Sequence, residues 1–126
     1  MEKVLKIVLA LLAAIATWFV VATVGNVVLR AAISGYRAQE VAMSFSLGAM
    51  LGRLAVGFLA TVAACVVAVR MRRSAVMGVM SGCVLLALFV PVHLSLWTKF
   101  PIWYHLFFLA SLPVVGLVTG RMSATK

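Results

Sequence analysis

Acidic residues are almost absent from this chain. Only Glu2 and Glu40 occur among its 126 residues, and charged residues of both signs make up 10% of it. A typical soluble domain is about one quarter charged and about half apolar, whereas this chain is 66% apolar. The composition therefore excludes a soluble globular domain and a disordered chain, and it predicts an integral membrane protein.

Cysteine is also scarce, and the motifs of common catalytic sites are missing. Cys65 and Cys83 lie in apolar segments without a CxxC spacing, so a disulfide scaffold or a redox pair is not expected. No phosphate-binding loop of the GxxxxGK[ST] type occurs. A proton relay of intramembrane carboxylates is not expected with so few acids. We therefore predict a protein that is not an enzyme and that holds no cofactor and no metal.

Long apolar segments are what the sequence does contain. We expect transmembrane helices at about 7–29, 42–69, 75–96 and 102–119. With short links these helices use nearly the whole chain, so residues 1–126 are predicted to form one membrane domain. The predicted fold class is an all-α integral membrane protein, a compact bundle of four transmembrane helices.

The second apolar segment is long for a membrane span. As a helix from Val41 to Val69 it would measure about 43 Å, more than a hydrocarbon core of about 30 Å requires. Either this helix tilts, or its first residues, through Leu47, lie outside the hydrocarbon. The stretch from Arg30 to Glu40 is more polar and predicts a connecting loop or a short interfacial helix.

Basic residues are distributed unevenly between the two ends of the predicted bundle. The end with both termini carries Lys3, Lys6, Arg70, Arg72, Arg73, Arg121 and Lys126, and the other end carries Arg30, Arg37 and Lys99. The positive-inside rule then places both termini in the cytoplasm, in a bacterial-type inner membrane. Tyr36, Trp97, Trp103 and Tyr104 fall at the opposite end, where interfacial aromatic residues are expected.

The net charge of +9 has a simple explanation in this arrangement. The basic residues occur in small groups at helix ends, and they form no continuous stripe that could follow a phosphate backbone. Anionic lipids and membrane topology account for the charge, so no nucleic-acid partner is expected. The predicted partners are membrane lipids and either further copies of the chain or a larger membrane protein.

Pairs of glycines four residues apart occur in three of the expected helices. They are Gly48 and Gly52, Gly78 and Gly82, and Gly116 and Gly120. Glycines at this spacing share one helix face and allow two backbones to approach closely. One interpretation is helix packing within the bundle, and the other is that one of the three faces contacts a second copy of the chain.

Arg53 is the one charged residue inside an expected span. A charge inside an apolar helix costs several kcal/mol unless it is paired, hydrated or able to reach the membrane surface. Three interpretations remain open. Its side chain extends to the outer headgroups, forms an ion pair with Glu40, or contacts an anion or a lipid headgroup inside the bundle.

Other polar residues fall near the same end of the expected helices as Arg53. They are Asn26, Glu40, His93 and His105. Together with Arg53 they form a candidate ligand-binding set that could line an outward-facing vestibule. The two histidines lack a third ligand of the usual type, so they do not predict a metal or haem site.

Three functional hypotheses follow. The first, and the prediction, is a small structural or accessory protein for membrane assemblies, without catalytic chemistry. The alternative is an oligomeric channel or carrier for a small anion or a lipid headgroup, with Arg53 as the anion contact. An enzyme that uses His93 or His105 as a general base is the least favoured, because the sequence places no residue that orients either ring.

Overall fold

The computed structural model describes residues 1–124, which form helices joined by short links. The α-helices of this range are α1 (Glu2–Ala32), α2 (Tyr36–Ala42), α3 (Leu47–Arg72), α4 (Val76–Ser95) and α5 (Ile102–Ala124). A single 3-10 turn, η1 (Trp97–Lys99), lies between α4 and α5. Four of the helices are long and apolar enough to cross a membrane: α1, α3, α4 and α5 as far as Met122. The expected all-α fold with four such helices is confirmed.

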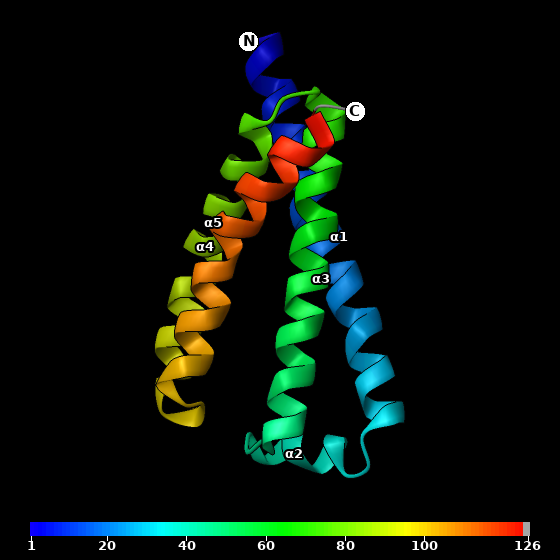
Figure 1. The fold of residues 1–126 in the computed structure, drawn as a ribbon, viewed down its shortest axis with the longest axis vertical. Coiled ribbons are helices and arrows are strands. Elements are labelled where there is room, and N and C mark those ends of the chain that lie inside the picture. Colours follow the sequence, from blue (N-terminus) through cyan, green and yellow to red (C-terminus); the bar gives the residue numbers. More distant parts are fainter. Residues whose placement is uncertain (125–126) are drawn as a thin grey trace.

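The long helices form two antiparallel pairs, α1 with α3 and α4 with α5 (Figure 1). The two pairs lie together near the end that carries both termini, and they diverge toward the opposite end. α3 also contacts α4 and α5, so it joins the two pairs. We call the end with the termini the narrow end and the opposite end, where α2 lies, the wide end.

The start of the second span differs from its prediction. The expected helix from residue 42 was wrong at its beginning, because Tyr36–Ala42 forms the separate helix α2 and α3 begins only at Leu47. Met43 has a left-handed backbone with φ of 53°, which ends α2. Ser46 then caps α3 by accepting a hydrogen bond from the Ala49 backbone N–H at 3.2 Å. The first residues of the apolar run therefore lie outside the long helix.

α1 and α3 contact one another through small residues. Ala10, Ala14 and Ala22 on α1 are buried together with Ala60, Ala64 and Ala68 on α3. A spacing of four residues keeps each set on one helix face and allows a close approach of the two helices. Trp18 takes one position in this series, and its Nε1–H donates a hydrogen bond to Thr61 Oγ1 at 3.0 Å.

α4 and α5 contact one another through glycines. A Cβ atom on Gly78 would collide with the Gly116 backbone oxygen, one on Gly116 with the Gly78 oxygen, and one on Gly82 with the Leu112 oxygen. Gly120 similarly faces the backbone of Ala75. The close approach of these two backbones therefore requires residues without a side chain.

The glycine pair of α3 does not take part in such a contact. A Cβ on Gly52 would meet only the flexible side chains of Leu29 and Ile33. A Cβ on Gly48 would find no atom of residues 1–124 within 4 Å. The three equivalent sequence motifs thus have different surroundings, and only those of α4 and α5 bring two backbones together.

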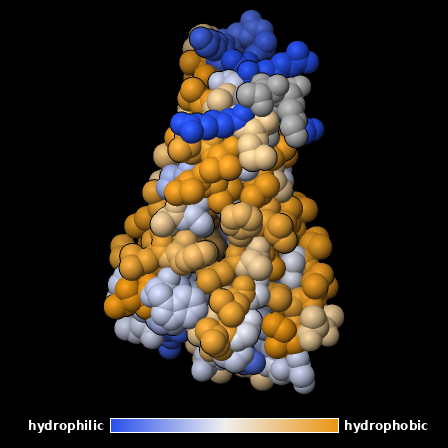
Figure 2. Space-filling view, viewed as in Figure 1, coloured by the Kyte–Doolittle hydropathy of each residue, from blue (hydrophilic) through white to orange (hydrophobic). Residues whose placement is uncertain are grey.

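The outer surface of the long helices is apolar. Large side chains such as Val8, Leu12, Phe58 and Leu106 are about half exposed or more. Figure 2 shows apolar residues over most of the molecule and strongly hydrophilic residues gathered at the narrow end. Together with the four helices that are apolar enough to cross a membrane, this surface is typical of a membrane location.

Candidate functional site

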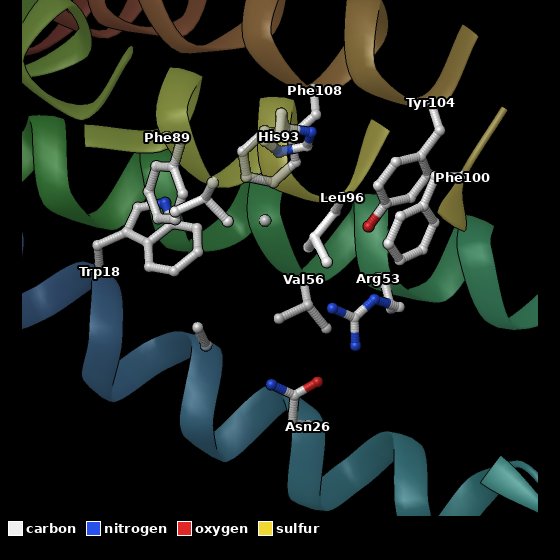
Figure 3. A pocket seen from close by; sticks show the side chains of 13 residues that line it. Trp18, Asn26, Arg53, Val56, Phe89, His93, Leu96, Phe100, Tyr104 and Phe108 are labelled. Atoms are coloured by element: carbon white, nitrogen blue, oxygen red, sulfur yellow. The ribbon is translucent and has the colours of Figure 1, made fainter. Parts of the chain in front are cut away.

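A cavity of about 120 Å³ lies between the two helix pairs (Figure 3). Its polar lining residues are Asn26 on α1, Arg53 on α3, His93 on α4 and Tyr104 on α5. Its apolar lining includes the rings of Trp18, Phe89 and Phe108. On α1, α4 and α5 the polar residue lies nearer the wide end than the aromatic one, and Leu96 and Phe100 add apolar lining at the level of the polar residues.

Arg53 lies inside this cavity lining rather than on the lipid-facing surface. It follows the start of α3 by six residues, or about 9 Å along the helix axis. Its Nη1 donates a hydrogen bond to the Tyr36 hydroxyl at 2.9 Å, and that hydroxyl lies 3.4 Å from Asn26 Oδ1. Its Nε–H is buried and has no hydrogen-bond partner among residues 1–124. The guanidinium is therefore held in place but is incompletely satisfied.

Aromatic rings form a wall beside the guanidinium. Phe45 stacks on Phe100 with ring centroids 5.4 Å apart, and Phe100 stacks on Tyr104 at 4.4 Å. Arg53 Cζ lies 4.6 Å from the centroid of Phe45, within the range of a cation–π interaction. The Tyr104 hydroxyl points toward Arg53 (Figure 3). This stack joins the link before α3 to the link before α5 and limits access of water to the charge.

The two histidines form a buried pair. His93 Nδ1 lies 2.7 Å from His105 Nδ1, and His105 Nε2 lies 3.2 Å from the backbone oxygen of Trp97. His93 is 6% exposed and His105 is fully buried. His93 lines the cavity, whereas His105 lies behind it and stacks on Trp97 with ring centroids 4.7 Å apart. The sequence did not anticipate that each ring orients the other.

Glu40 forms its ion pair with Arg30 and not with Arg53. The Arg30 Nε–H donates to Glu40 Oε1 at 2.7 Å, and Arg30 Nη2 donates to Oε2 at 3.0 Å. The hypothesis of an ion pair between Glu40 and Arg53 was therefore wrong. The hydrogen bond from Arg30 lowers the pKa of the Glu40 carboxyl. Burial acts in the opposite direction, but its effect is smaller, and the positive charges of Arg30, Arg53 and Arg37 lower the pKa further.

The structure brings together part of the candidate set. Asn26, Arg53 and His93 line one cavity, and His105 reaches it only through His93. Glu40 lies on α2 in its ion pair with Arg30 and does not line the cavity. Within residues 1–124, no three His, Cys, Asp or Glu side chains are grouped so that they could hold a metal ion.

Four aromatic residues of the site were not expected there. Tyr36 and Tyr104 were expected at the membrane interface, yet they are 0% and 4% exposed and both face Arg53. Phe45 and Phe100 complete the wall. Phe45 and Phe100 lie in the two links at the same end as Arg53. This position was the available signal for their contact with Arg53, because a charge inside an apolar bundle needs amphipathic neighbours.

Comparisons with protein-family models, with curated proteins and with solved structures found no match for this chain. Functional interpretation therefore depends on the chemistry of the cavity. A guanidinium can donate five hydrogen bonds and accepts none, and its planar fork suits carboxylate and phosphate oxygens. The arrangement around Arg53 is chemically suited to hold an oxyanion.

Proposed function

We propose that this protein binds the anionic headgroup of an amphipathic molecule in the cavity between its two helix pairs. The observation that carries the proposal is the unsatisfied Nε–H of Arg53, a charged group in a helix that is long and apolar enough to cross a membrane. An anion bound there would pair with the charge and accept the free hydrogen bond. This is the lipid-headgroup form of the anion-site hypothesis.

The chain itself has no free acid to neutralise Arg53. Its two acids are Glu2 and Glu40. Glu40 is bound by Arg30, and Glu2 lies 3.6 Å from Lys6 at the opposite end of the molecule. An unpaired charge in a medium of low dielectric constant is costly, and a charge-assisted hydrogen bond to an oxyanion offsets that cost. The surroundings of Arg53 therefore favour an external anion.

The combination of polar and apolar lining residues supports an amphipathic ligand over a simple ion. The headgroup would lie against Arg53 and Asn26, and apolar atoms would extend toward Trp18, Phe89 and Phe108. Pockets that enclose whole drug-sized ligands measure about 300 Å³ or more. A cavity of about 120 Å³ is suited to a headgroup and its first carbons.

The orientation in the membrane is part of the same proposal. At the narrow end the described basic residues are Lys3, Lys6, Arg70, Arg72, Arg73 and Arg121, while Lys126 lies outside the described residues. The wide end carries Arg30, Arg37 and Lys99 at its surface. The positive-inside rule assigns the narrow end, with both termini, to the cytoplasm. The cavity then lies in the outer half of a bacterial-type inner membrane.

Lipid binding by Arg53 variants tests this function. We expect wild-type protein in detergent to retain phosphatidylglycerol in preference to phosphatidylcholine, as measured by native mass spectrometry during lipid titration. Arg53→Gln removes the charge-assisted hydrogen bonds and is expected to weaken phosphatidylglycerol binding about 10- to 100-fold. Arg53→Lys keeps the charge without the planar fork and is expected to show an intermediate loss.

Arg37→Gln is the matched control, because Arg37 is an exposed arginine at the same end of the molecule. It removes the same charge and is expected to leave binding within about twofold of wild type. Equal loss in Arg37→Gln and Arg53→Gln would show attraction to surface charge and would contradict the cavity site. Equal retention of both lipids by the wild-type protein would also contradict it.

The structural or accessory function remains a hypothesis with a different expectation. Under it, Arg53 stabilises the assembly, so Arg53→Ala would lower the amount of protein in the membrane and its oligomeric mass. Under the proposed function, the same variant accumulates and assembles normally and loses the lipid preference.

A further inference from the structure

The hydrogen bonds of the histidine pair determine which ring nitrogens carry protons. A backbone carbonyl can only accept, so the contact between His105 Nε2 and the Trp97 oxygen requires a proton on His105 Nε2. A neutral imidazole carries one N–H, which leaves His105 Nδ1 as an acceptor. The 2.7 Å contact then requires His93 Nδ1–H to donate to His105 Nδ1. His93 Nε2 is consequently without a proton.

The charged alternative is unfavourable at this position. A doubly protonated His105 would place a cation at a fully buried site that stacks on Trp97 and meets the edge of Phe100. Arg53 is already a positive charge in the lining of the adjoining cavity. Both acids of the chain are paired with other residues. Burial of a second unpaired cation beside it is costly.

His93 Nε2 is therefore a free acceptor at the cavity. His93 lines the cavity, and its Nε2 makes no hydrogen bond within residues 1–124. Arg53 offers only donors, and Asn26 Oδ1 already faces the Tyr36 hydroxyl. The cavity lining thus combines donors for an oxyanion with an acceptor, His93 Nε2, that a pure oxyanion cannot satisfy.

Building on the proposed anion site, we propose that His93 Nε2 accepts a hydrogen bond from a hydroxyl of the bound headgroup. The ligand class is then an anionic lipid whose headgroup also carries a hydroxyl, such as a phosphoglycerol lipid. A phosphodiester without a hydroxyl would fill the Arg53 position and leave His93 unpaired. His105 is a positioning residue, because it fixes the tautomer of His93 and does not contact the ligand.

Nitrogen NMR of the histidine rings tests the tautomer without any ligand. The chain contains only two histidines, so protein labelled with ¹⁵N-histidine has four ring nitrogens to observe. At neutral pH we expect one ring protonated at Nδ1 and the other at Nε2, and a His105→Phe variant assigns them. Two rings protonated at Nε2, or a doubly protonated ring, would overturn the inference.

A pair of lipids tests the selectivity on the wild-type protein. Phosphatidylmethanol carries the same phosphodiester charge as phosphatidylglycerol but has no hydroxyl in its headgroup. We expect about fivefold tighter binding of phosphatidylglycerol, the factor that one ordinary hydrogen bond contributes. In His93→Phe, which keeps a ring and removes the acceptor, the two affinities are expected to become equal.

The possible results separate the two proposals. Equal affinities of the wild-type protein for the two anionic lipids, both above that for phosphatidylcholine, would overturn the role of His93 and leave the Arg53 site intact. A preference that survives in His93→Phe would have the same meaning. Affinities no higher than that for phosphatidylcholine would overturn the proposed function and this inference together.

Discussion

Arg53 and Glu40 show how neighbouring residues of opposite charge can have separate roles. Arg30 binds both carboxylate oxygens of Glu40, and no ion pair joins this acid to Arg53 within residues 1–124. Arg53 Nη1 donates a hydrogen bond to the Tyr36 hydroxyl, and the Phe45 ring lies beside Arg53 Cζ. Arg53 is thereby positioned without being neutralised. Positioned but unneutralised charges are typical of groups that bind an external ion.

The ion pair of Glu40 predicts a response to acid. A carboxyl with a lowered pKa in the folded state contributes stability above its ordinary pKa of 4.5, and that contribution is lost as the pH falls through the lowered value. We expect acidification from about pH 6 to about pH 3 to lower the melting temperature of wild-type protein more than that of Glu40→Gln. The difference will be small, because both partners are partly exposed to solvent.

Thermal unfolding in detergent at several pH values measures this difference. Glu2→Gln is the control, because Glu2 is 84% exposed and pairs only with Lys6 at the narrow end. It is expected to keep the acid response of the wild-type protein. Identical curves for Glu40→Gln and wild type would show that the Arg30–Glu40 pair contributes nothing to stability.

At the scale of the helices, each pair has its own means of close contact. α1 and α3 use alanines at intervals of four residues, and α4 and α5 use glycines whose backbones touch. The bare motif of two glycines four residues apart did not distinguish these cases. Whether a glycine meets a backbone, a side chain or lipid depends on the rotation of each helix, which the local sequence leaves open.

Two alanine substitutions test the different surroundings of the glycines. Gly82→Ala places a Cβ against the Leu112 backbone and is expected to lower stability by about 1–3 kcal/mol, because two helix backbones must separate. Gly48→Ala adds the same atom where no described neighbour lies within 4 Å, and it is expected to be neutral or slightly stabilising. Unfolding of both variants in mixed micelles measures the free energies.

The comparison is informative because alanine is a better helix former than glycine at both positions. The higher helix propensity of alanine would by itself stabilise Gly82→Ala, so a loss of stability in this variant must come from the clash with the Leu112 backbone. Equal stability of the two variants would mean that α4 and α5 can separate at no cost. A strong effect of Gly48→Ala would instead indicate a contact with another protein at the start of α3.

The whole molecule has two ends of different character. The narrow end is strongly hydrophilic, whereas the wide end holds the cavity and the aromatic wall (Figures 1 and 2). The helix pairs diverge toward the wide end, and the cavity lies between them.

Topology reporters test the orientation of the whole molecule. A fluorescent protein fused after Lys126 is expected to be fluorescent in a bacterial host, since it folds in the cytoplasm. Alkaline phosphatase inserted at Thr98, in the turn between α4 and α5, is expected to be active because that turn faces the periplasm. Active phosphatase fused at the C-terminus would show the reverse orientation and would place the cavity in the inner leaflet.

Most of the fold was predictable from the sequence because a membrane imposes simple rules. Apolar runs of sufficient length must become helices, since the backbone has no other hydrogen-bond partner in lipid. The extent of the helices was less certain where polarity changed gradually. Residues 41–46 are apolar enough to extend a helix, yet Met43 and the Ser46 cap separate α2 from α3.

The sequence predicted at which depth along the helices the site lies, because depth in a membrane follows from the number of residues between a side chain and the helix end. It also predicted that Arg53 is unusual, because it is the one charged residue inside an expected span. The directions of the side chains were not predictable, because they depend on how four helices rotate and pair in three dimensions. Only the tertiary structure decided that Glu40 pairs with Arg30, that Tyr36 and Tyr104 turn inward, and that His93 and His105 share a hydrogen bond. Composition thus determined the environment of this protein, and helix packing determined its chemistry.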